Sequence, residues 1–144
     1  MARLDEVDEL VVQYHLALGE FMKANPEPAK KLFSHRDDLT LANPRGGLAP
    51  GWRQVAKTME RAASSRRDGD ATGFEIVAKH VTSELAYVVE VEWLKAKIYG
   101  GEDITPYALR VTMIFRPEDG TWKVVHRHAD PISTAQTAES VIQK

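Results

Sequence analysis

Hydrophobic residues in the N-terminal part of the chain recur at the spacing of an α-helix. Between residues 3 and 24 they return every three or four positions, and acidic residues crowd the first turns, where the helix dipole favours them. The sequence Asn25-Pro26 ends this helix and starts a short second one over 26–34. A third stripe, which begins at Trp52, predicts a helix over 51–67. The apolar positions of the first helix are Leu4, Val7, Val11, Tyr14, Leu18 and Phe21.

The second half of the chain carries strand patterns. Runs rich in β-branched and aromatic residues, separated by turn sequences such as Pro117-Glu118-Asp119-Gly120, predict four antiparallel strands. Two of these runs are apolar on both faces, which is typical of a sheet covered by helices on one face and by a partner on the other. A short strand is expected at 39–41, and 44–51 is expected to be a loop because of its glycines and prolines. The four long strands are placed near 72–82, 85–99, 105–116 and 121–131.

Composition narrows the class of protein. With 144 residues, 43% of them hydrophobic and 28% charged, the chain has the size and balance of one globular domain over 1–144, with a short polar tail at 133–144. The formal net charge of −2 argues against a nucleic-acid partner. The chain has no cysteine, which excludes disulfides, thiolate nucleophiles and cysteine zinc sites. The acidic N-terminus and the lack of a long apolar run predict a cytoplasmic protein with no membrane partner.

The last predicted strand contains two histidines and an aspartate at alternating positions. If its alternation is unbroken, Trp122, Val124, His126, His128 and Asp130 share one face. Two imidazoles and a carboxylate on one face need hydrogen-bond partners or a ligand when they are buried. Three roles are open: a hydrogen-bonded structural network, acid/base or ligand contact in a pocket, and a metal pair. We expect no metal, because no spacing in the sequence fixes a third metal ligand, and the sequence implies no cofactor.

Glu92 lies in the apolar run of the second long strand and needs a partner there. Arg110 on the next strand is the natural one, and we expect the two residues to form an ion pair that is at least half buried. The alternative is a catalytic role, in which Glu92 orients a histidine of the last strand for proton transfer. Glu90 is two positions earlier on the same face and is a weaker candidate of the same kind.

Two aromatic residues are candidates for a pocket wall. Tyr14 lies on the apolar stripe of the first helix, either as a core residue or as a hydroxyl donor to a cavity between helix and sheet. Trp52 starts the third helix after the predicted loop, and it either packs in the core or closes the mouth of a pocket. The sequence contains neither a serine nucleophile elbow nor a glycine-rich phosphate loop.

Three helices followed by a long sheet that ends in Trp-x-x-x-His-x-His resemble the nuclear transport factor 2-like superfamily, in particular its SnoaL-like and ketosteroid-isomerase-like members. The resemblance implies an α+β, cystatin-like cone, in which a curved antiparallel sheet encloses a pocket closed by three N-terminal helices. It also implies a homodimer through the outer face of the sheet. The fold hosts isomerases, cyclases, dehydratases, hydrolases and non-catalytic proteins, so it leaves the function open. The resemblance covers about residues 3–132 and is carried by Glu92, Arg110-Val111-Thr112, Asp119-Gly120, Trp122 and His126-Arg127-His128-Ala129-Asp130.

The resemblance also places a candidate site. Ketosteroid isomerases use an aspartate before a proline as general base, and the matching position here is Asn43-Pro44. An amide cannot take up a proton at neutral pH, so the isomerase mechanism is not expected. The candidates for chemistry are His126, His128, Glu92 and Arg110, and the candidates for ligand contact are Tyr14, Asn43, Trp52, Thr112 and Asp130.

The leading hypothesis is binding of a small, largely apolar molecule in the cone, alone or with acid/base chemistry of the isomerase, dehydratase, cyclase or hydrolase type on a polyketide- or steroid-like substrate. In such an enzyme a histidine or carboxylate moves a proton while Arg110, Tyr14 or Asn43 polarises an oxygen. The alternative is a non-catalytic dimerising scaffold or ligand-sequestering module. A closed, dry cavity with the histidines or Glu92 pointing inward favours chemistry, and a filled cone with those groups paired favours the scaffold.

Overall fold

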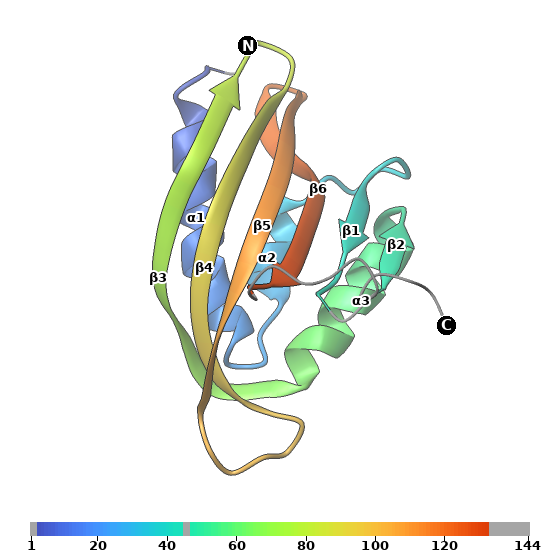
Figure 1. The fold of residues 1–144 in the computed structure, drawn as a ribbon. Coiled ribbons are helices and arrows are strands. Elements are labelled where there is room, and N and C mark those ends of the chain that lie inside the picture. Colours follow the sequence, from blue (N-terminus) through green and yellow to red (C-terminus); the bar gives the residue numbers. More distant parts are fainter. Residues whose placement is uncertain (1–2, 45–46, 133–144) are drawn as a thin grey trace, which may run out of the picture.

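The computed structural model describes residues 3–44 and 47–132, and the predicted tail at 133–144 lies outside this range. Three helices and two short strands precede four long strands (Figure 1). All three helices form where they were predicted, although each is a few residues shorter at its ends. None of the helices in the described range is long and apolar enough to cross a membrane. The elements are α1 (Glu6–Phe21), α2 (Glu27–Leu32), β1 (Thr40–Ala42), β2 (Leu48–Pro50), α3 (Trp52–Ser64), β3 (Arg66–Val81), β4 (Ala86–Ile98), β5 (Thr105–Glu118) and β6 (Thr121–Pro131).

The strands form one six-stranded sheet in the order β2-β1-β6-β5-β4-β3. Strands β3 to β6 are an antiparallel meander, as predicted, and Asp119 and Gly120 turn the chain between β5 and β6 with φ angles of 52° and 83°. Strand β1 pairs parallel with β6, and β2 pairs antiparallel with β1. Strand β2 overturns the prediction of a loop throughout 44–51. A three-residue strand is too short to show a periodic pattern, and it forms against the edge that β1 offers.

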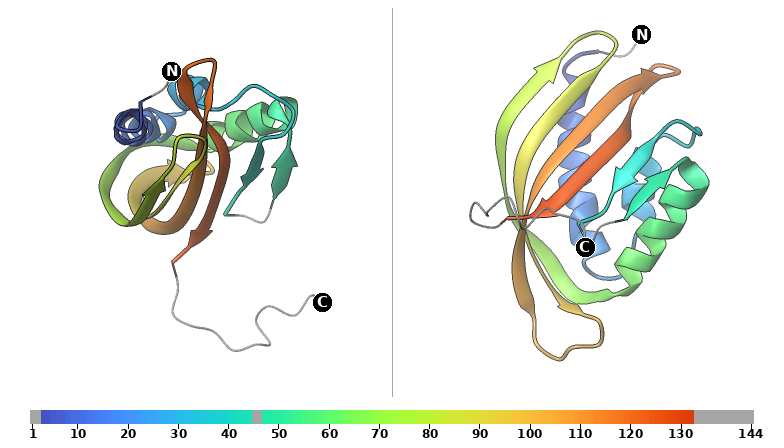
Figure 2. Two further views of the ribbon diagram at one scale, coloured as in Figure 1. Left: turned by 90° about the horizontal axis from the view of Figure 1, so that it is seen from above. Right: turned by 45° about the vertical axis from the view of Figure 1, so that its right-hand side comes forward.

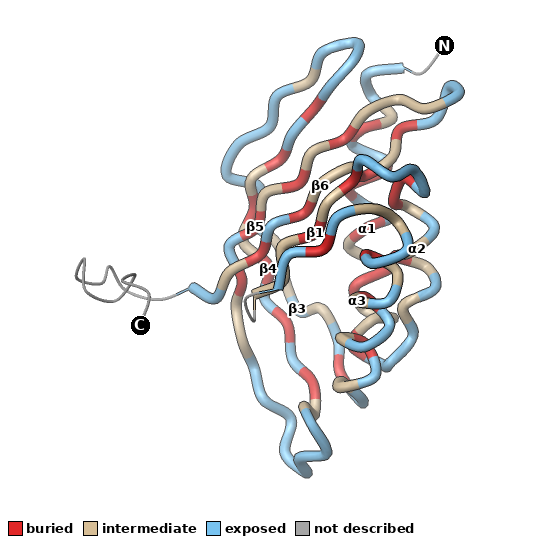
Figure 3. The backbone as a smooth tube through the Cα atoms, turned by 90° about the vertical axis from the view of Figure 1, so that its right-hand side faces the viewer, coloured by how far each residue is buried: buried red, intermediate tan, exposed pale blue. Residues whose placement is uncertain are grey.

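The sheet curls, and the three helices lie on its concave side (Figures 1 and 2). Helix α1 runs along the long strands, whereas α3 lies beside β1 and β2. Buried positions alternate along β4 and β5, so one face of the sheet is turned towards the helices (Figure 3). The predicted α+β architecture of a curved antiparallel sheet with N-terminal helices is therefore confirmed.

The core lies between α1 and the concave face of the sheet. Val88 and Leu94 of β4 and Met113 and Phe115 of β5 are at most 2% exposed, and they pack with the apolar stripe of α1. A fully buried side chain of this kind contributes about 1.5–3 kcal/mol relative to an exposed one. This packing fixes α1 against the sheet and thereby positions the residues that α1 turns inward.

A β-bulge interrupts the alternation of β6. Ile114 of β5 pairs with His126, whereas the next residue, Phe115, pairs with Val124. The shift leaves Val125 as an extra residue on β6 without a partner of its own across the strands. Because side chains alternate with a period of two, one extra residue exchanges the faces of everything that follows it.

The bulge changes which polar residues of β6 face the helices. Trp122, before the bulge, is buried, and after the bulge the buried polar residue is Arg127. The prediction that His126, His128 and Asp130 share a face with Trp122 is therefore wrong. These three residues share a face with one another, but it is the convex face of the sheet.

Gly69 in β3 leads to a prediction about stability. A Cβ atom at this position would overlap the carbonyl oxygen of Lys95 and would lie 2.7 Å from the Cβ of Ala96. Gly69→Ala should therefore lower the free energy of unfolding by about 1–3 kcal/mol, because the strands must move apart. Gly73→Ala in the same strand is the matched control, since its Cβ would meet only the Trp93 ring at 3.5 Å. Urea unfolding measures both, and equal midpoints for the two variants would contradict the prediction.

Candidate functional site

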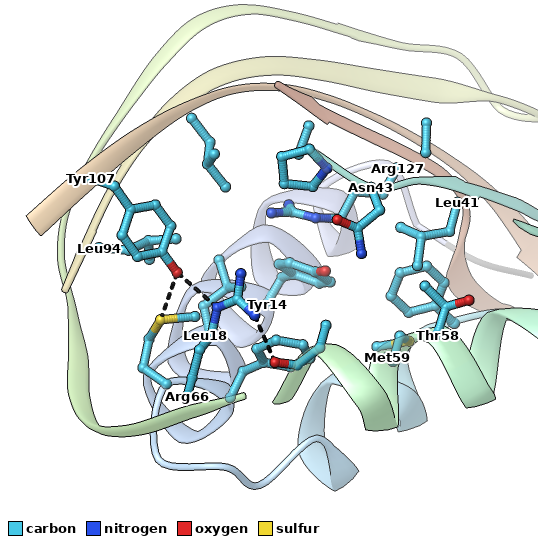
Figure 4. Close-up of a pocket in the computed structure, with 18 residues that line it drawn as sticks. Tyr14, Leu18, Leu41, Asn43, Thr58, Met59, Arg66, Leu94, Tyr107 and Arg127 are labelled. Atoms are coloured by element: carbon cyan, nitrogen blue, oxygen red, sulfur yellow. Dashed lines mark hydrogen bonds between the residues drawn. The ribbon is translucent and has the colours of Figure 1, made fainter. Parts of the chain in front are cut away.

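A cavity lies between the concave face of the sheet and helices α1 and α3 (Figure 4). Its volume is about 70 Å³, which leaves room for a few water molecules or a small organic group. The walls are mostly apolar, with side chains such as Leu18, Phe33 and Leu94. Among the residues that the structure describes, six polar or charged side chains complete the wall, and none is a carboxylate or an imidazole. They are Tyr14, Asn43, Thr58, Arg66, Tyr107 and Arg127.

Arg127 reaches the cavity wall from β6 and forms a buried ion pair with Glu92 of β4. Its Nη1 and Nη2 donate to the two carboxylate oxygens over 2.8 and 2.7 Å, and the two residues are 7% and 0% exposed. Burial alone would raise the pKa of Glu92, but the charge and hydrogen bonds of Arg127 hold that pKa below its ordinary value. Glu92 is thus an ionised carboxylate that is paired with Arg127, and it is poorly suited to take a proton from a ligand.

Glu90, two residues before Glu92, is fully buried on the same face. Nε2 of His15 in α1 lies 2.9 and 3.1 Å from its two oxygens, and the imidazole stacks on Phe74 with ring centroids 3.6 Å apart. Burial raises the pKa of Glu90 to about 7 against the opposing hydrogen bond from His15, and the neighbouring Glu92 adds to the rise. This pair joins α1 to the sheet, and neither of its members lines the cavity.

Tyr14 brings a hydroxyl group from α1 to the cavity. The Arg127 guanidinium lies over its ring, with 5.1 Å between Cζ and the ring centroid, and the ring is tilted against Phe33. Burial raises the pKa of Tyr14 well above its ordinary value, although Arg127 acts in the opposite direction. The phenol therefore keeps its proton at physiological pH and is a hydrogen-bond donor to the cavity rather than a base.

Arg66 and Tyr107 form a second polar corner of the wall. Nε of Arg66 donates to the Tyr107 hydroxyl over 3.0 Å, and this hydroxyl donates to the sulfur of Met22 over 3.1 Å. Nη1 of Arg66 donates to the carbonyl oxygen of Ala62 in α3 over 2.6 Å. In Figure 4 this corner lies at the opposite end of the cavity from Leu41. These bonds hold a second guanidinium in the wall.

The two histidines that were predicted to carry chemistry lie on the convex face, outside the cavity. Oγ1 of Thr40 and Nδ1 of His126 are 2.7 Å apart, and Nε2 of His128 lies 3.2 Å from the Asp130 carboxylate. Arg110 completes this cluster, 3.7 Å from the same carboxylate. Of the roles left open for these histidines, acid/base or ligand contact in the pocket is therefore excluded, because the bulge in β6 turns both rings away from the cavity. Within residues 3–44 and 47–132, no three histidine, aspartate or glutamate side chains come together as a metal site.

The expected ion pair between Glu92 and Arg110 does not form. In the register of β4 and β5, Glu92 lies opposite Leu109, and Arg110 lies opposite Val91 on the other face. The Arg110 side chain is 73% exposed. The prediction was therefore right that Glu92 needs a buried cation and wrong about its identity, since Arg127 takes this place.

The candidates for ligand contact divide between the two faces of the sheet. Tyr14 and Asn43 lie in the cavity wall. Trp52 does not line the cavity, and it stacks on a histidine imidazole with ring centroids 3.9 Å apart. Thr112 and Asp130 lie on the convex face with the histidines.

Sequence reasoning missed several residues of the wall, above all Arg127. One signal was available: two glutamates on an otherwise apolar face of β4 require a cation nearby. The two glutamates do not indicate which basic residue pairs with them, because the bulge in β6 decides which residue of that strand faces Glu92. The other missed residues are Thr58, Arg66 and Tyr107, which no local pattern distinguishes from ordinary surface or core positions.

Comparison with known proteins places the fold. Residues 7–132 match the family model of the SnoaL-like domain, as the resemblance predicted. A nuclear transport factor 2-like superfamily protein from Salmonella enterica serovar Typhimurium superposes with a TM-score of 0.77 at 18% identity, over 94% of each chain. A ketosteroid isomerase-like protein from Erwinia carotovora atroseptica superposes with a TM-score of 0.74 at 19% identity, over 90% of this chain and 96% of the other.

A third similar structure is an uncharacterised protein with a cystatin-like fold from Caulobacter vibrioides. Its TM-score is 0.68 at 18% identity, over 90% of this chain and 89% of the other. No curated protein matches the chain. At such identities the similar structures establish the fold alone, and the contacts described above must carry any argument about function.

The buried pair leads to a second prediction. Arg127→Ala should lower the free energy of unfolding by about 3–5 kcal/mol, because Glu92 then stays buried without its cation. Arg110→Ala makes the same chemical change in an exposed pair and should cost no more than about 0.5 kcal/mol. The double variant Arg127→Met/Glu92→Leu should recover most of the loss, since neither charge of the pair remains. Denaturant unfolding followed by circular dichroism tests this, and similar losses for the two single variants would count against the pair.

Proposed function

We propose that this chain, which belongs to the SnoaL-like domain family, binds a small, largely apolar molecule that carries at least one hydrogen-bond-accepting oxygen. The observation that supports the proposal is the composition of the cavity. Its described walls are apolar, with hydrogen-bond donors and two guanidinium groups at a few points and no carboxylate or imidazole. Small-molecule sites have this composition, in which a few polar groups orient an otherwise apolar ligand.

Tyr14 and Arg127 are the central polar groups of the proposed site. The phenol is protonated, and Arg127 already directs two N–H groups at Glu92. A ligand oxygen that accepts a hydrogen bond from Tyr14 would therefore feel the guanidinium charge without having to displace Glu92. A fixed donor beside a positive charge in a water-poor site stabilises an oxygen that bears negative charge.

The two other hypotheses from the sequence receive less support from the same residues. An acid/base enzyme needs a group that exchanges a proton with its ligand. Asn43 is an amide, Glu92 is held by Arg127, and Glu90 does not line the cavity. A purely structural scaffold corresponds to a filled cone, whereas this cone retains open space. Binding without proton transfer therefore agrees best with the lining.

1-Octanol is a suitable first probe, because it combines a flexible apolar chain with one oxygen. Calorimetric titration should give saturable binding to the wild-type protein. Ala129→Leu adds a bulky group to a buried residue of the cavity wall and should weaken this binding at least about tenfold, because the added group occupies the space of the ligand. Ala108→Leu on the convex face of β5 is the matched control and should bind like the wild type.

Circular dichroism and unfolding midpoints verify that the Ala129→Leu and Ala108→Leu variants fold. Two results would overturn the proposal: no saturable binding by the wild type, or binding by the folded Ala129→Leu variant that equals that of the wild type.

We also propose that the chain forms a homodimer through the convex face of the sheet. Tyr87 and Trp93 of β4 are 39% and 41% exposed there, and the half-buried Val89 and Val91 lie between them on the same face. Contiguous apolar residues on an exposed sheet face are typical of an interaction surface. We expect a second copy of this chain to cover the face, because strands that are apolar on both faces are typical of a sheet with helices on one side and a partner on the other.

Light scattering at micromolar concentration should give twice the 16.1 kDa mass of one chain. Trp93→Glu should shift this mass towards the monomer, because association would bury an unpaired charge. Leu16→Glu, at a 65% exposed position of α1, is the control and should leave the mass unchanged. A monomeric wild-type protein would contradict the proposed dimer.

A further inference from the structure

A second hollow adjoins the cavity on the side of α3. Its volume is about 470 Å³. Asn43, Thr58, Ala62 and Arg66 line both hollows, so the two meet along a shared wall. We call the second hollow the vestibule.

The vestibule is cationic. Lys57 and Arg61 lie one turn apart on α3 and line it together with Arg66, and no aspartate or glutamate is among its described lining residues. Neither Lys57 nor Arg61 takes part in an ion pair within the described part of the chain. Glu60, the acidic residue of α3, instead binds Lys30 of α2 over 2.8 Å. The charge of the vestibule therefore has no internal counter-ion among these residues.

Arg66 connects the vestibule with the cavity. Its guanidinium is held by three neutral acceptors: the carbonyl oxygen of Ala62, the hydroxyl of Ser65 at 3.0 Å and the hydroxyl of Tyr107 at 3.0 Å. Neutral acceptors fix the orientation of a guanidinium without cancelling its charge. Arg66 is a preorganised cation at the shared wall, and two more cations lie beyond it. Together these positive charges favour the binding of an anion.

We propose that the ligand is an amphipathic anion, whose apolar part occupies the cavity and whose carboxylate or phosphate group occupies the vestibule. This inference rests on the proposed function and adds the charge and the position of the ligand's head group. The head group contacts Lys57, Arg61 and Arg66, and the apolar part passes the shared wall towards Tyr14. A neutral molecule of the same length fills only the apolar half of this arrangement.

Three probes that carry the same octyl group test the proposal: nonanoate, octyl phosphate and 1-octanol, titrated at pH 7.5 and low ionic strength. At least one of the two anions should bind about tenfold more tightly than octanol, and salt should weaken the binding of the anion but not that of octanol. The double variant Lys57→Gln/Arg61→Gln should lose this tenfold preference and keep its affinity for octanol. Arg53→Gln on the same helix removes an exposed charge outside the vestibule and should keep the preference.

Three outcomes would overturn the inference while leaving the proposed function intact. They are equal binding of octanol and both anions, an unchanged preference in the double variant, and an equal loss of preference in Arg53→Gln, which would point to net charge rather than to the vestibule. Absence of binding by all three probes would overturn the proposed function and this inference together. The preferred anion identifies the head group, because the two anions share the chain and differ in the acid.

Discussion

The concave face of the sheet depends on the buried ion pair between Glu92 and Arg127. The two residues belong to β4 and β6, which are separated by β5, and their side chains bridge the intervening strand. Each charge has been taken out of water, and each is tolerable in the core only while the other is present. The pair thus links β4 to β6 on the concave face of the sheet. It also forces the register of both strands to keep these residues on the same face.

This pair also decides what the neighbouring groups can do. Arg127 pairs with Glu92, and the second buried carboxylate, Glu90, has His15 as its partner. Burial raises the pKa of Glu90 to about 7, although the hydrogen bond with His15 acts in the opposite direction. Tyr14 lies under the guanidinium and stays a neutral donor. The outcome is a cavity that presents donors and positive charge, while the carboxylates are kept in the supporting structure.

The distribution of charge separates three environments in one small fold. Inside the cone, the carboxylates are paired and buried, whereas the Arg66 guanidinium is held by neutral acceptors. In the vestibule along α3, Lys57 and Arg61 are exposed and lack carboxylate partners among the described residues. On the convex face, His128, Asp130 and Arg110 form a solvated cluster in which electrostatic interactions are weak. Only the first two environments adjoin the cavity, so the histidines that stand out in the sequence lie on the opposite face of β6 from it.

The sequence by itself determined the helices, the four long strands and the fold family, because these follow from local periodicity, turn residues and a recognisable strand pattern. It also identified Tyr14 and Asn43, which lie in the cavity wall, and the need of Glu92 for a cation. The tertiary structure decided which cation that is and which way the last strand turns its polar groups. A single unpaired residue, Val125, exchanges the two faces of β6, and nothing in the local pattern marks a bulge that arises from pairing with β5. Periodicity is a property of neighbouring residues, whereas register and curvature are settled by contacts between distant ones.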